Sequence, residues 1–457
     1  MKRLALALTL VTAVSPVSAA TAETGRAFTS RVVTSGLADP YEITFGPDGM
    51  LWATEKSGLR VLRIDPQTGA QHTAVTIPDA IHTDWSQDGV LGMALHPGLL
   101  KGRDHVFVAY TYDSDPGPAQ AARTKIARYT YDPQTQQLGQ PVDVITGLAG
   151  GVDHQSARLV FGPDGKLYYT IGEQGANQFG AKCLPIQAQR LPTAAEVQAK
   201  DWTAYRGKVL RLNQDGSIPA DNPVLGGVRS HVFSYGHRNA QGLVFGTNGL
   251  LYSSEQGPKT DDEVNIIGRG KNYGWPHVAG YRDDKAYVYG NWSAAPDCEQ
   301  LDFSDYEIPP SVPQATETSW NHPDFVPPIR TFHTVPSDHN FMDPQCADGE
   351  MWYLCWPTVA PASLDFVSRG ALHNSLLMPA LKDGTVYRLA LTHDGKRVDS
   401  VEPLWRTTNR YRDTAISPDG KTFYVATDST GNTKDATGKP TNALANPGSI
   451  LEFKLGS

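Results

Sequence analysis

The chain has 457 residues, and its 43 glycines and 33 prolines together exceed the usual share of turn-forming residues. Because both residues destabilise helix interiors, this composition excludes a long helical bundle or coiled coil and leaves short strands joined by tight turns, while 40 % apolar residues exclude a disordered chain. The net charge of −8, from 40 basic and 48 acidic residues, argues against a nucleic-acid partner, which requires a basic face.

The N-terminus predicts export. Lys2 and Arg3 precede an apolar run over residues 4–14, and small residues follow at 17–19. This is the pattern of a secretory leader, and the apolar run is shorter than the roughly 20 residues that cross a bilayer. We expect a signal peptide over residues 1–22, cleaved after Ala19 or Ala22, and a periplasmic or secreted protein that does not span the membrane.

One motif recurs along the chain, in which an apolar strand end meets an Asp-Gly or Asn-Gly corner and an aromatic strand follows, at residues 45–52, 161–168, 245–252 and 416–424. A short apolar strand, often with an arginine, recurs six times, at 61–64, 126–131, 209–212, 264–267, 386–389 and 450–454. The repeats predict an all-β fold, a six-bladed β-propeller of four-stranded antiparallel sheets. At about 72 residues per blade, long loops are expected on the active-site face. Residues 23–457 contain no linker-like stretch and are predicted to form a single domain.

Four cysteines in an exported chain are disulfide candidates. Cys346 and Cys355 are nine residues apart and are expected to pair, which leaves Cys183 and Cys298 as a second candidate pair. The paired CxxC spacing of a structural zinc site is absent from the sequence.

Four polar clusters depart from the repeat, and the first two occupy corresponding positions. Residues 151–156 place His154 beside Asp153, as a general base requires, although a structural histidine is the alternative. Residues 236–242 bring dense hydrogen-bonding groups to the same end of the next repeat. The pair predicts one shared pocket, and a solvated loop is the alternative for the second cluster.

The other two clusters are charged. Residues 255–263, with 272–276 and 283–284, offer carboxylates and carbonyls of the kind that calcium binds, although an acidic surface loop is the alternative. Arg410 and Arg412 stand two apart on an extended segment and so share a face. A multiply charged carboxylate ligand suits their forked donors, and a salt-bridged structural pair is the alternative.

The clusters together carry a resemblance. The chain resembles the soluble quinoprotein glucose dehydrogenase family in a series of segments that follow one another in the same order over nearly the whole mature chain. These segments are residues 153–156, 168–172, 236–239, 255–258, 261–263, 272–276, 355–361 and 409–413. This resemblance implies a propeller that binds pyrroloquinoline quinone (PQQ) and calcium. It also implies oxidation of the anomeric hydroxyl of glucose and other aldoses to the lactone, by general-base proton abstraction and hydride transfer, with an unidentified electron acceptor.

The resemblance assigns roles to individual residues. In the catalytic set, His154 resembles the general base, and Asp153 and Glu173 resemble its carboxylate neighbours. Arg238 resembles the residue that stabilises negative charge on the quinone. The cofactor-binding set comprises Arg238, Asn239, Gln256, Trp356, Thr358, Lys382, Arg410 and Arg412. The sugar-facing set comprises Gln87, Asp153, His154, Tyr353 and Trp356. Calcium at the cofactor would be bound by the carbonyls of Gly257 and Pro258. A further calcium site, associated in the family with a homodimer, matches Asp262, Glu263, Tyr273, Ala279 and Asp283.

Two departures from the family pattern stand near the base and the sugar. Glu173 replaces a shorter aspartate, and Trp85 stands two residues before Gln87, where its ring is expected to narrow the substrate entrance.

Two other functions remain as hypotheses, a calcium-dependent sugar-lactone hydrolase and a non-catalytic exported binding propeller. The hydrolase has no need of Lys382 and the two arginines converging on one ligand, and the binding propeller gives no reason for His154 beside a set of groups that suits a cofactor.

Overall fold

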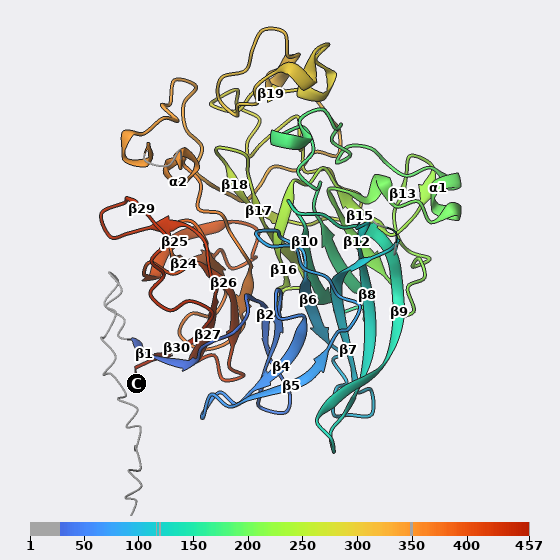
Figure 1. Ribbon diagram of the computed structural model, residues 1–457, viewed down its shortest axis with the longest axis vertical. Coiled ribbons are helices and arrows are strands. Elements are labelled where there is room, and N and C mark those ends of the chain that lie inside the picture. Colours follow the sequence, from blue (N-terminus) through green and yellow to red (C-terminus); the bar gives the residue numbers. More distant parts are fainter. Residues whose placement is uncertain (1–27, 116, 118–119, 348–350, 457) are drawn as a thin grey trace, which may run out of the picture.

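The computed structural model describes residues 28–115, 117, 120–347 and 351–456. These residues form six four-stranded antiparallel sheets (Figure 1). The first three sheets are β2 (Pro40–Phe45), β3 (Leu51–Glu55), β4 (Arg60–Ile64) and β5 (Gln71–Thr76); β6 (Val90–Leu95), β7 (His105–Asp113), β8 (Ala122–Asp132) and β9 (Gln137–Ala149); and β10 (Ser156–Phe161), β11 (Leu167–Ile171), β12 (Lys208–Leu212) and β15 (Val232–Tyr235). The last three are β16 (Asn239–Phe245), β17 (Leu251–Gln256), β18 (Asp262–Ile266) and β21 (Arg330–Phe332); β22 (Asp365–Val367), β23 (Ser375–Pro379), β24 (Thr385–Leu391) and β25 (Val398–Arg406); and β26 (Tyr411–Ile416), β27 (Thr422–Thr427), β30 (Ile450–Leu455) and β1 (Phe28–Thr34).

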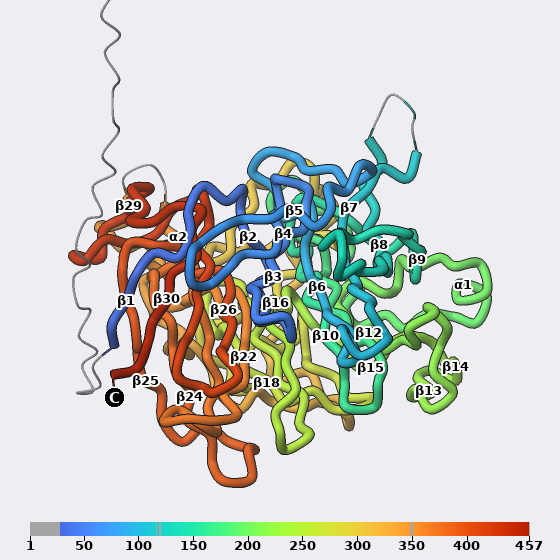
Figure 2. Tube along the Cα trace, turned by 90° about the horizontal axis from the view of Figure 1, so that it is seen from below, coloured from blue at the N-terminus to red at the C-terminus, as the bar shows by residue number. Residues whose placement is uncertain are grey.

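The six sheets close into a ring, so the predicted six-bladed propeller is confirmed. The first strands of successive sheets, β2, β6, β10, β16, β22 and β26, each contact the next, and β26 contacts β2. β1 pairs with β30, so that the N-terminal strand completes the C-terminal sheet (Figure 2). The core lies between neighbouring sheets, where Trp52, Tyr252 and Trp405 are fully buried.

The recurring motifs have a structural cause. In the first sheet, Arg63 forms an ion pair with Asp48 of the corner at 2.7 Å, and in the third Arg211 pairs with Asp164 at 2.8 Å. Each corner ends on a glycine with positive φ, such as Gly49 at 77°, a conformation that disfavours side chains. The arginine of one repeated element therefore fixes the aspartate of the other.

Long connections leave the ring on the side where β19 and α2 are seen in Figure 1. They contain two short helices, α1 (Ala194–Ala199) and α2 (Trp352–Cys355). They also contain three ribbons, β13 (Val224–Leu225) with β14 (Val228–Arg229), β19 (Tyr289–Gly290) with β20 (Gln314–Ala315), and β28 (Thr433–Lys434) with β29 (Pro440–Thr441). Single 3-10 turns occur at Phe179–Ala181, Thr203–Tyr205, Trp292–Ala294, Cys298–Gln300, Glu317–Ser319 and Pro344–Cys346. Both candidate disulfides form, Cys183–Cys298 and Cys346–Cys355, so these predictions are confirmed.

The predicted signal peptide is not tested by the structure. The leader over residues 1–22 lies outside the described residues, and the single-domain organisation of 23–457 stays a prediction. Within the described part of the chain, every helix is too short or too polar to cross a membrane.

Candidate active site

The predicted general base, His154, lies in the loop that leads from β9 into β10. It is buried, with 5 % of its surface exposed, and its Nδ1 donates a hydrogen bond to Glu173. Glu173 also accepts hydrogen bonds from the backbone N–H groups of Gly175 (3.0 Å) and Ala176 (2.9 Å). Because the carboxylate holds the proton on Nδ1, Nε2 is the nitrogen that can accept a substrate proton. The longer glutamate therefore still reaches the base.

Two glutamine side chains hold the carboxyl group of Asp153. Gln87 donates to Oδ1 at 3.0 Å and Gln178 to Oδ2 at 2.8 Å, while Oδ1 lies 3.7 Å from His154 Nε2. Burial acts to raise the pKa of Asp153, but the nearby His154 and Arg238 outweigh it and hold this pKa below its usual value. Asp153 is therefore an ionised hydrogen-bond acceptor beside the base.

Arg238 lies between β15 and β16, and its positive charge lowers the pKa of Asp153. It donates to the carbonyl of Gly257 at 2.9 Å and to Oε1 of Gln178 at 3.2 Å, and it lies 5.2 Å from the ring centre of Trp275. Its Nε is buried and has no partner within the described residues. A buried donor without a partner is costly, so this group is suited to a ligand that carries negative charge. Asn239 donates to Gln256 at 3.0 Å beside it.

A cavity of about 320 Å³ opens next to these residues. Several predicted residues line it, namely Gln87, Gln256, Tyr353, Lys382, Arg410 and Arg412, together with Asp39, Lys56, Trp85, Ser86, Gln241, Leu354, Ala360, Leu381, Asp428, Thr430 and Gly431. The ammonium group of Lys382 donates hydrogen bonds to the carbonyl of Trp356 (2.6 Å) and to the hydroxyl of Thr358. The structure thus brings four of the eight predicted cofactor-binding residues, Gln256, Lys382, Arg410 and Arg412, to the lining of one cavity.

Positive charge exceeds negative charge in this cavity. Asp428 accepts from Arg410 at 3.0 Å and from Arg412 at 2.7 Å, which realises the salt-bridged alternative for this pair. Burial acts to raise the pKa of Asp428, but these arginines outweigh it and lower this pKa to about 2. Burial lowers the pKa of Lys382 to about 7, because it disfavours the charged ammonium group. Four basic side chains, including Lys56, line the cavity with only two carboxylates, and a bound anion would favour the charged form of Lys382. An anionic ligand would balance the excess, so the donor set fits a compound with several carboxylates.

Of the five predicted sugar-facing residues, Gln87 and Tyr353 line the cavity, whereas Asp153, His154 and Trp356 do not. The indole of Trp356 donates to the carbonyl of Phe341 at 3.1 Å and lies edge-on to Tyr306. It does not line the cavity itself, and it reaches the site through the carbonyl that holds Lys382.

The residues predicted for calcium fall into two places. Gly257 offers its carbonyl near Arg238, and Pro258 lines a small pocket next to Gln178. Asp262 is occupied by three backbone N–H groups, those of Gly257 (2.8 Å), Val359 (2.6 Å) and Ala360 (2.7 Å), so its carboxylate ties two loops together.

Farther out, the remaining predicted ligands lie among acidic side chains. Glu263 accepts from the N–H of Gly280 at 2.6 Å, the hydroxyl of Tyr273 donates to the carbonyl of Ile266 at 2.6 Å, and Ala279 donates its N–H to Glu317 at 3.0 Å. Asp283 donates its N–H to the same glutamate at 3.3 Å. Within the described residues, no three histidine, cysteine, aspartate or glutamate side chains converge in a metal-binding arrangement.

Electrostatics nevertheless sets these acidic residues apart. Burial and the neighbouring Asp283 raise the pKa of Asp261 to about 6, and burial with Asp283 and Asp261 raises the pKa of Glu317 to about 7. Burial and Glu255 raise the pKa of Glu263 well above its usual value. We call Asp261, Glu263, Asp283 and Glu317 the carboxyl cluster. Lys285 pairs with Asp283 at 3.0 Å, but this cation does not offset the burial of Asp261, Glu263 and Glu317, whose pKa values stay raised.

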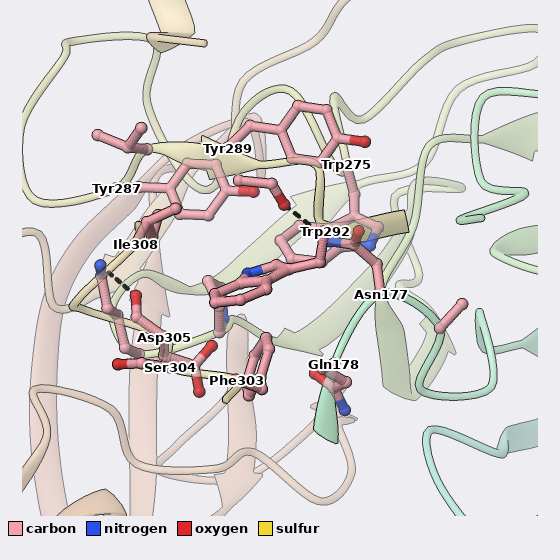
Figure 3. A pocket seen from close by; sticks show the side chains of 15 residues that line it. Asn177, Gln178, Trp275, Tyr287, Tyr289, Trp292, Phe303, Ser304, Asp305 and Ile308 are labelled. Carbon is pink, nitrogen blue, oxygen red and sulfur yellow. Dashed lines mark hydrogen bonds between the residues drawn. The ribbon is translucent and has the colours of Figure 1, made fainter. Parts of the chain in front are cut away.

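A small aromatic pocket lies on the other side of Gln178 (Figure 3). Trp275, Tyr287, Tyr289, Trp292 and Phe303 form its walls. The Cys183–Cys298 disulfide joins the two long loops that supply Gln178 and Phe303. This pocket supports the loop that carries Gln178 and so the position of Asp153 and Arg238.

Sequence reasoning missed four residues of this region: Lys56, Gln178, Glu317 and Asp428. One of them could have been found by counting strand register. Arg410 precedes β26 and Asp428 follows β27, and these strands form a hairpin whose Asp-Gly corner is visible in the sequence. Counting outward from the corner places Asp428 opposite Tyr411, next to Arg410, and a register shift between Tyr411 and Asp413 brings it opposite Arg410 itself. The other three lie on loops that the repeat does not define.

Comparisons with known proteins agree with this geometry. The sequence model of the glucose/sorbosone dehydrogenase family matches residues 37–312. Quinoprotein glucose dehydrogenase B of Acinetobacter calcoaceticus is 44 % identical over 438 residues, 93 % of this chain and 91 % of the relative. Two solved structures share the fold. The PQQ-bound aldose sugar dehydrogenase of Streptomyces coelicolor has 24 % identity and a TM-score of 0.62, covering 94 % of this chain and 98 % of its own. The aldose sugar dehydrogenase of Escherichia coli has 22 % identity and a TM-score of 0.63, covering 94 % and 99 %.

Proposed function

The chain belongs to the glucose/sorbosone dehydrogenase family, and from this premise we propose that it is a PQQ- and calcium-dependent dehydrogenase that oxidises the anomeric hydroxyl of glucose and other aldoses to the lactone. The cation-lined cavity beside His154 carries this proposal. Four basic side chains, those of Lys56, Lys382, Arg410 and Arg412, line it with only two carboxylates, and a tricarboxylate cofactor would offset this excess of positive charge.

The residues of the chain divide the chemistry between them. His154 Nε2 takes the proton of the anomeric hydroxyl, and Glu173, bonded to Nδ1, stabilises the imidazolium that forms. Asp153, held by Gln87 and Gln178, orients the sugar hydroxyls near Nε2. Such orientation converts a bimolecular encounter into a positioned one.

Arg238 supplies the charge stabilisation. Its buried Nε is a free donor among the described residues, and it is preorganised by the hydrogen bonds of its other nitrogens to Gly257 and Gln178. When bound, PQQ supplies the quinone that accepts the two electrons of the sugar, and calcium polarises it. Lys382, Arg410, Arg412 and Asn239 would hold the cofactor, and the carbonyls of Gly257 and Pro258 are hard oxygen donors that suit calcium.

Further parts of the proposal concern assembly and location. A second calcium ion at the carboxyl cluster would offset the burial, and the lesser repulsion between carboxylates, that raise the pKa values of Asp261 and Glu317. By the family resemblance this ion accompanies a homodimer. The leader pattern over residues 1–22 supports export to the periplasm or beyond, and the natural electron acceptor is a separate molecule.

Reconstitution is the direct test. Purified apo-protein is loaded with PQQ and calcium, and the reduction of a dye is followed with glucose and a panel of aldoses. We expect glucose-dependent reduction that requires both additions. Absence of reduction with every aldose would overturn the proposal.

The two rival functions give different results in the same experiment. A sugar-lactone hydrolase would open a lactone with calcium alone, without PQQ. A binding propeller would take up its ligand and turn over nothing. The excess of cations in the cavity favours the dehydrogenase over both, because neither rival requires a polyanionic ligand.

A further inference from the structure

Lys56 lines the cation-lined cavity with an ammonium group that the protein itself only partly occupies. The residue follows β3, and its Nζ donates a hydrogen bond to the carbonyl of Ser86 at 3.0 Å. An ammonium group has three N–H donors, so two of those of Lys56 are without a partner in the described part of the chain. Lys382, by comparison, already donates to Trp356 and Thr358. Lys56 therefore has donors available for an anion in the cavity.

The two carboxylates that line the cavity do not neutralise Lys56. Asp39 accepts from the N–H of Ser429 at 3.0 Å, and Asp428 accepts from the two arginines. Burial and the neighbouring Arg412 lower the pKa of Lys56, and they outweigh Asp39 and Asp428, which act to raise it. The surroundings of Lys56 are thus short of negative charge, and a bound carboxylate would favour its charged form.

The partner of Lys56 belongs to the loop on the sugar side of the cavity. Ser86 stands between Trp85, which lines the cavity with 90 % of its surface exposed, and the predicted sugar-facing Gln87. The backbone of Lys56 contacts the same loop a second time. Its carbonyl oxygen would lie 2.2 Å from a Cβ atom at Gly89, whose φ is +130°, so only glycine fits there. Lys56 and this loop are therefore packed together closely.

Gln87 connects the loop to the general base. Its side chain donates to Oδ1 of Asp153 at 3.0 Å, and the same oxygen accepts from the N–H of His154 at 2.8 Å. The carbonyl of Ser86 and the N–H of Gln87 belong to one planar peptide group. The hydrogen bond from Lys56 to that carbonyl therefore fixes the point from which the side chain of Gln87 reaches Asp153.

We propose that Lys56 serves the cofactor and the sugar together. Its ammonium group binds a carboxylate of the anionic cofactor and, through the carbonyl of Ser86, positions Gln87 and Asp153 for the sugar. This inference rests on the proposed dehydrogenase function. It adds a fourth cation to the cofactor-binding set of Lys382, Arg410 and Arg412, and it makes Lys56 a positioning residue for the substrate.

The test of cofactor binding compares two variants. Lys56→Met keeps the length of the side chain and removes the ammonium group, whereas Lys56→Arg keeps a charged donor. Apo-protein is titrated with PQQ in the presence of calcium, and binding is followed by the quenching of tryptophan fluorescence, which requires no turnover. In Lys56→Met the Kd for PQQ should rise about three- to tenfold, as expected for one lost hydrogen bond, and Lys56→Arg should restore most of the affinity.

The test of sugar positioning uses the loaded enzyme at saturating PQQ. In Lys56→Met the KM for glucose should rise about two- to fivefold, because Gln87 and Asp153 are held less firmly. The kcat should stay within about twofold, because the base and its carboxylate partner are unchanged. Such a split between KM and kcat is the signature of lost substrate binding, and a general loss of folded protein would lower kcat instead.

Lys166→Met is the matched control, because Lys166 also donates a hydrogen bond, to Asn213, and does not line the cavity. Its Kd for PQQ and its KM for glucose should equal those of the wild type. A wild-type Kd in Lys56→Met overturns the inference, as does a wild-type KM for glucose or an equal loss of PQQ affinity in Lys56→Arg. If Lys56→Met does not fold, Lys56→Gln takes its place under the same criteria. Failure of the proposed function is distinct, because the wild type would then bind no PQQ.

Discussion

The cation-lined cavity and the carboxyl cluster are two regions with opposite excess charge. In the cavity, Asp428 binds two arginines and its pKa falls to about 2. In the cluster, Glu317 has acidic neighbours and its pKa rises to about 7. One region is therefore suited to an anion and the other to a cation, since each sign of charge is disfavoured by burial until it is balanced.

The two regions also differ in how much room they leave. The cavity encloses about 320 Å³ and its cations point into it. In the carboxyl cluster the carboxylates are already engaged by backbone N–H groups, as Glu317 is by Ala279 and Asp283. An organic anion can enter the first region, whereas the second is suited to a single small ion. The size of the expected ligand thus follows from packing and its charge from electrostatics.

The largest effect is expected from substitution of the general base, His154. This substitution would separate proton abstraction from binding of the anionic cofactor in the cavity. His154→Ala should lower kcat about 10²- to 10⁴-fold, the usual contribution of a positioned general base. The affinity for PQQ should stay within about twofold, because His154 lies outside the cation set. Stopped-flow reduction and a PQQ titration measure the two quantities.

The exposed His393 gives the matched variant, His393→Ala, which should retain wild-type turnover. If His154→Ala kept more than a tenth of the wild-type kcat, another group would have to serve as base. If instead it lost PQQ altogether, the assumed separation of base and anion site would be wrong.

The next effect tests the excess of positive charge directly. Arg412→Ala should weaken PQQ binding about 10- to 100-fold, the range expected for one lost hydrogen bond between charged groups. Turnover at saturating PQQ should change less. Fluorescence or activity titration of apo-protein with PQQ measures the shift.

Arg388 provides the control for this variant. It pairs with Glu402 at 2.9 Å on β24, away from the cavity. Arg388→Ala should leave the PQQ affinity at the wild-type value. Equal affinities in Arg412→Ala and the wild type would mean that the arginine pair serves only to hold Asp428, and the contrast between the two regions would fail.

Much of the fold was predictable because the repeated motif depends on interactions between residues that are close together in the sequence. The corner glycines and the Asp48–Arg63 type of ion pair recur in the sequence, and they set the hairpins from which each sheet is built. The closure by β1 was not predictable in this way. Residues 28–34 carry no copy of the motif, and their place is fixed by pairing with a strand more than 400 residues later.

Residues of the site were predictable where they belong to a recognisable sequence motif. They were not predictable where a long loop places them in the site only through tertiary packing. His154 and Arg238 stand at strand starts that the repeat defines. Gln178 and Glu317 lie on long insertions, and only tertiary packing brings them to Asp153 and Ala279. The reach of Glu173 to the base likewise depends on a turn geometry that the sequence does not reveal.

The smallest effect concerns stability against pH, and it has opposite sign in the two regions. Asp428, with a lowered pKa, contributes stability that is present above its ordinary value and is lost as pH falls towards about 2. Glu317 and Asp261, with raised pKa values of about 7 and about 6, contribute stability that is present below their ordinary values and is lost as pH rises through these values. Calcium-free protein should therefore lose stability between about pH 4.5 and 7.

Urea unfolding of chelator-treated protein at pH 5 and pH 7.5 measures this loss. Glu317→Gln should reduce the loss by about 1 kcal/mol or more, because the neutral amide does not ionise as pH rises. The exposed Glu299 gives the control, Glu299→Gln, which should show the wild-type loss. Other buried carboxyls titrate in the same range, so the difference between the two variants is the informative quantity. If that difference were zero, Glu317 would already be balanced within the fold, and the carboxyl cluster would not need a cation.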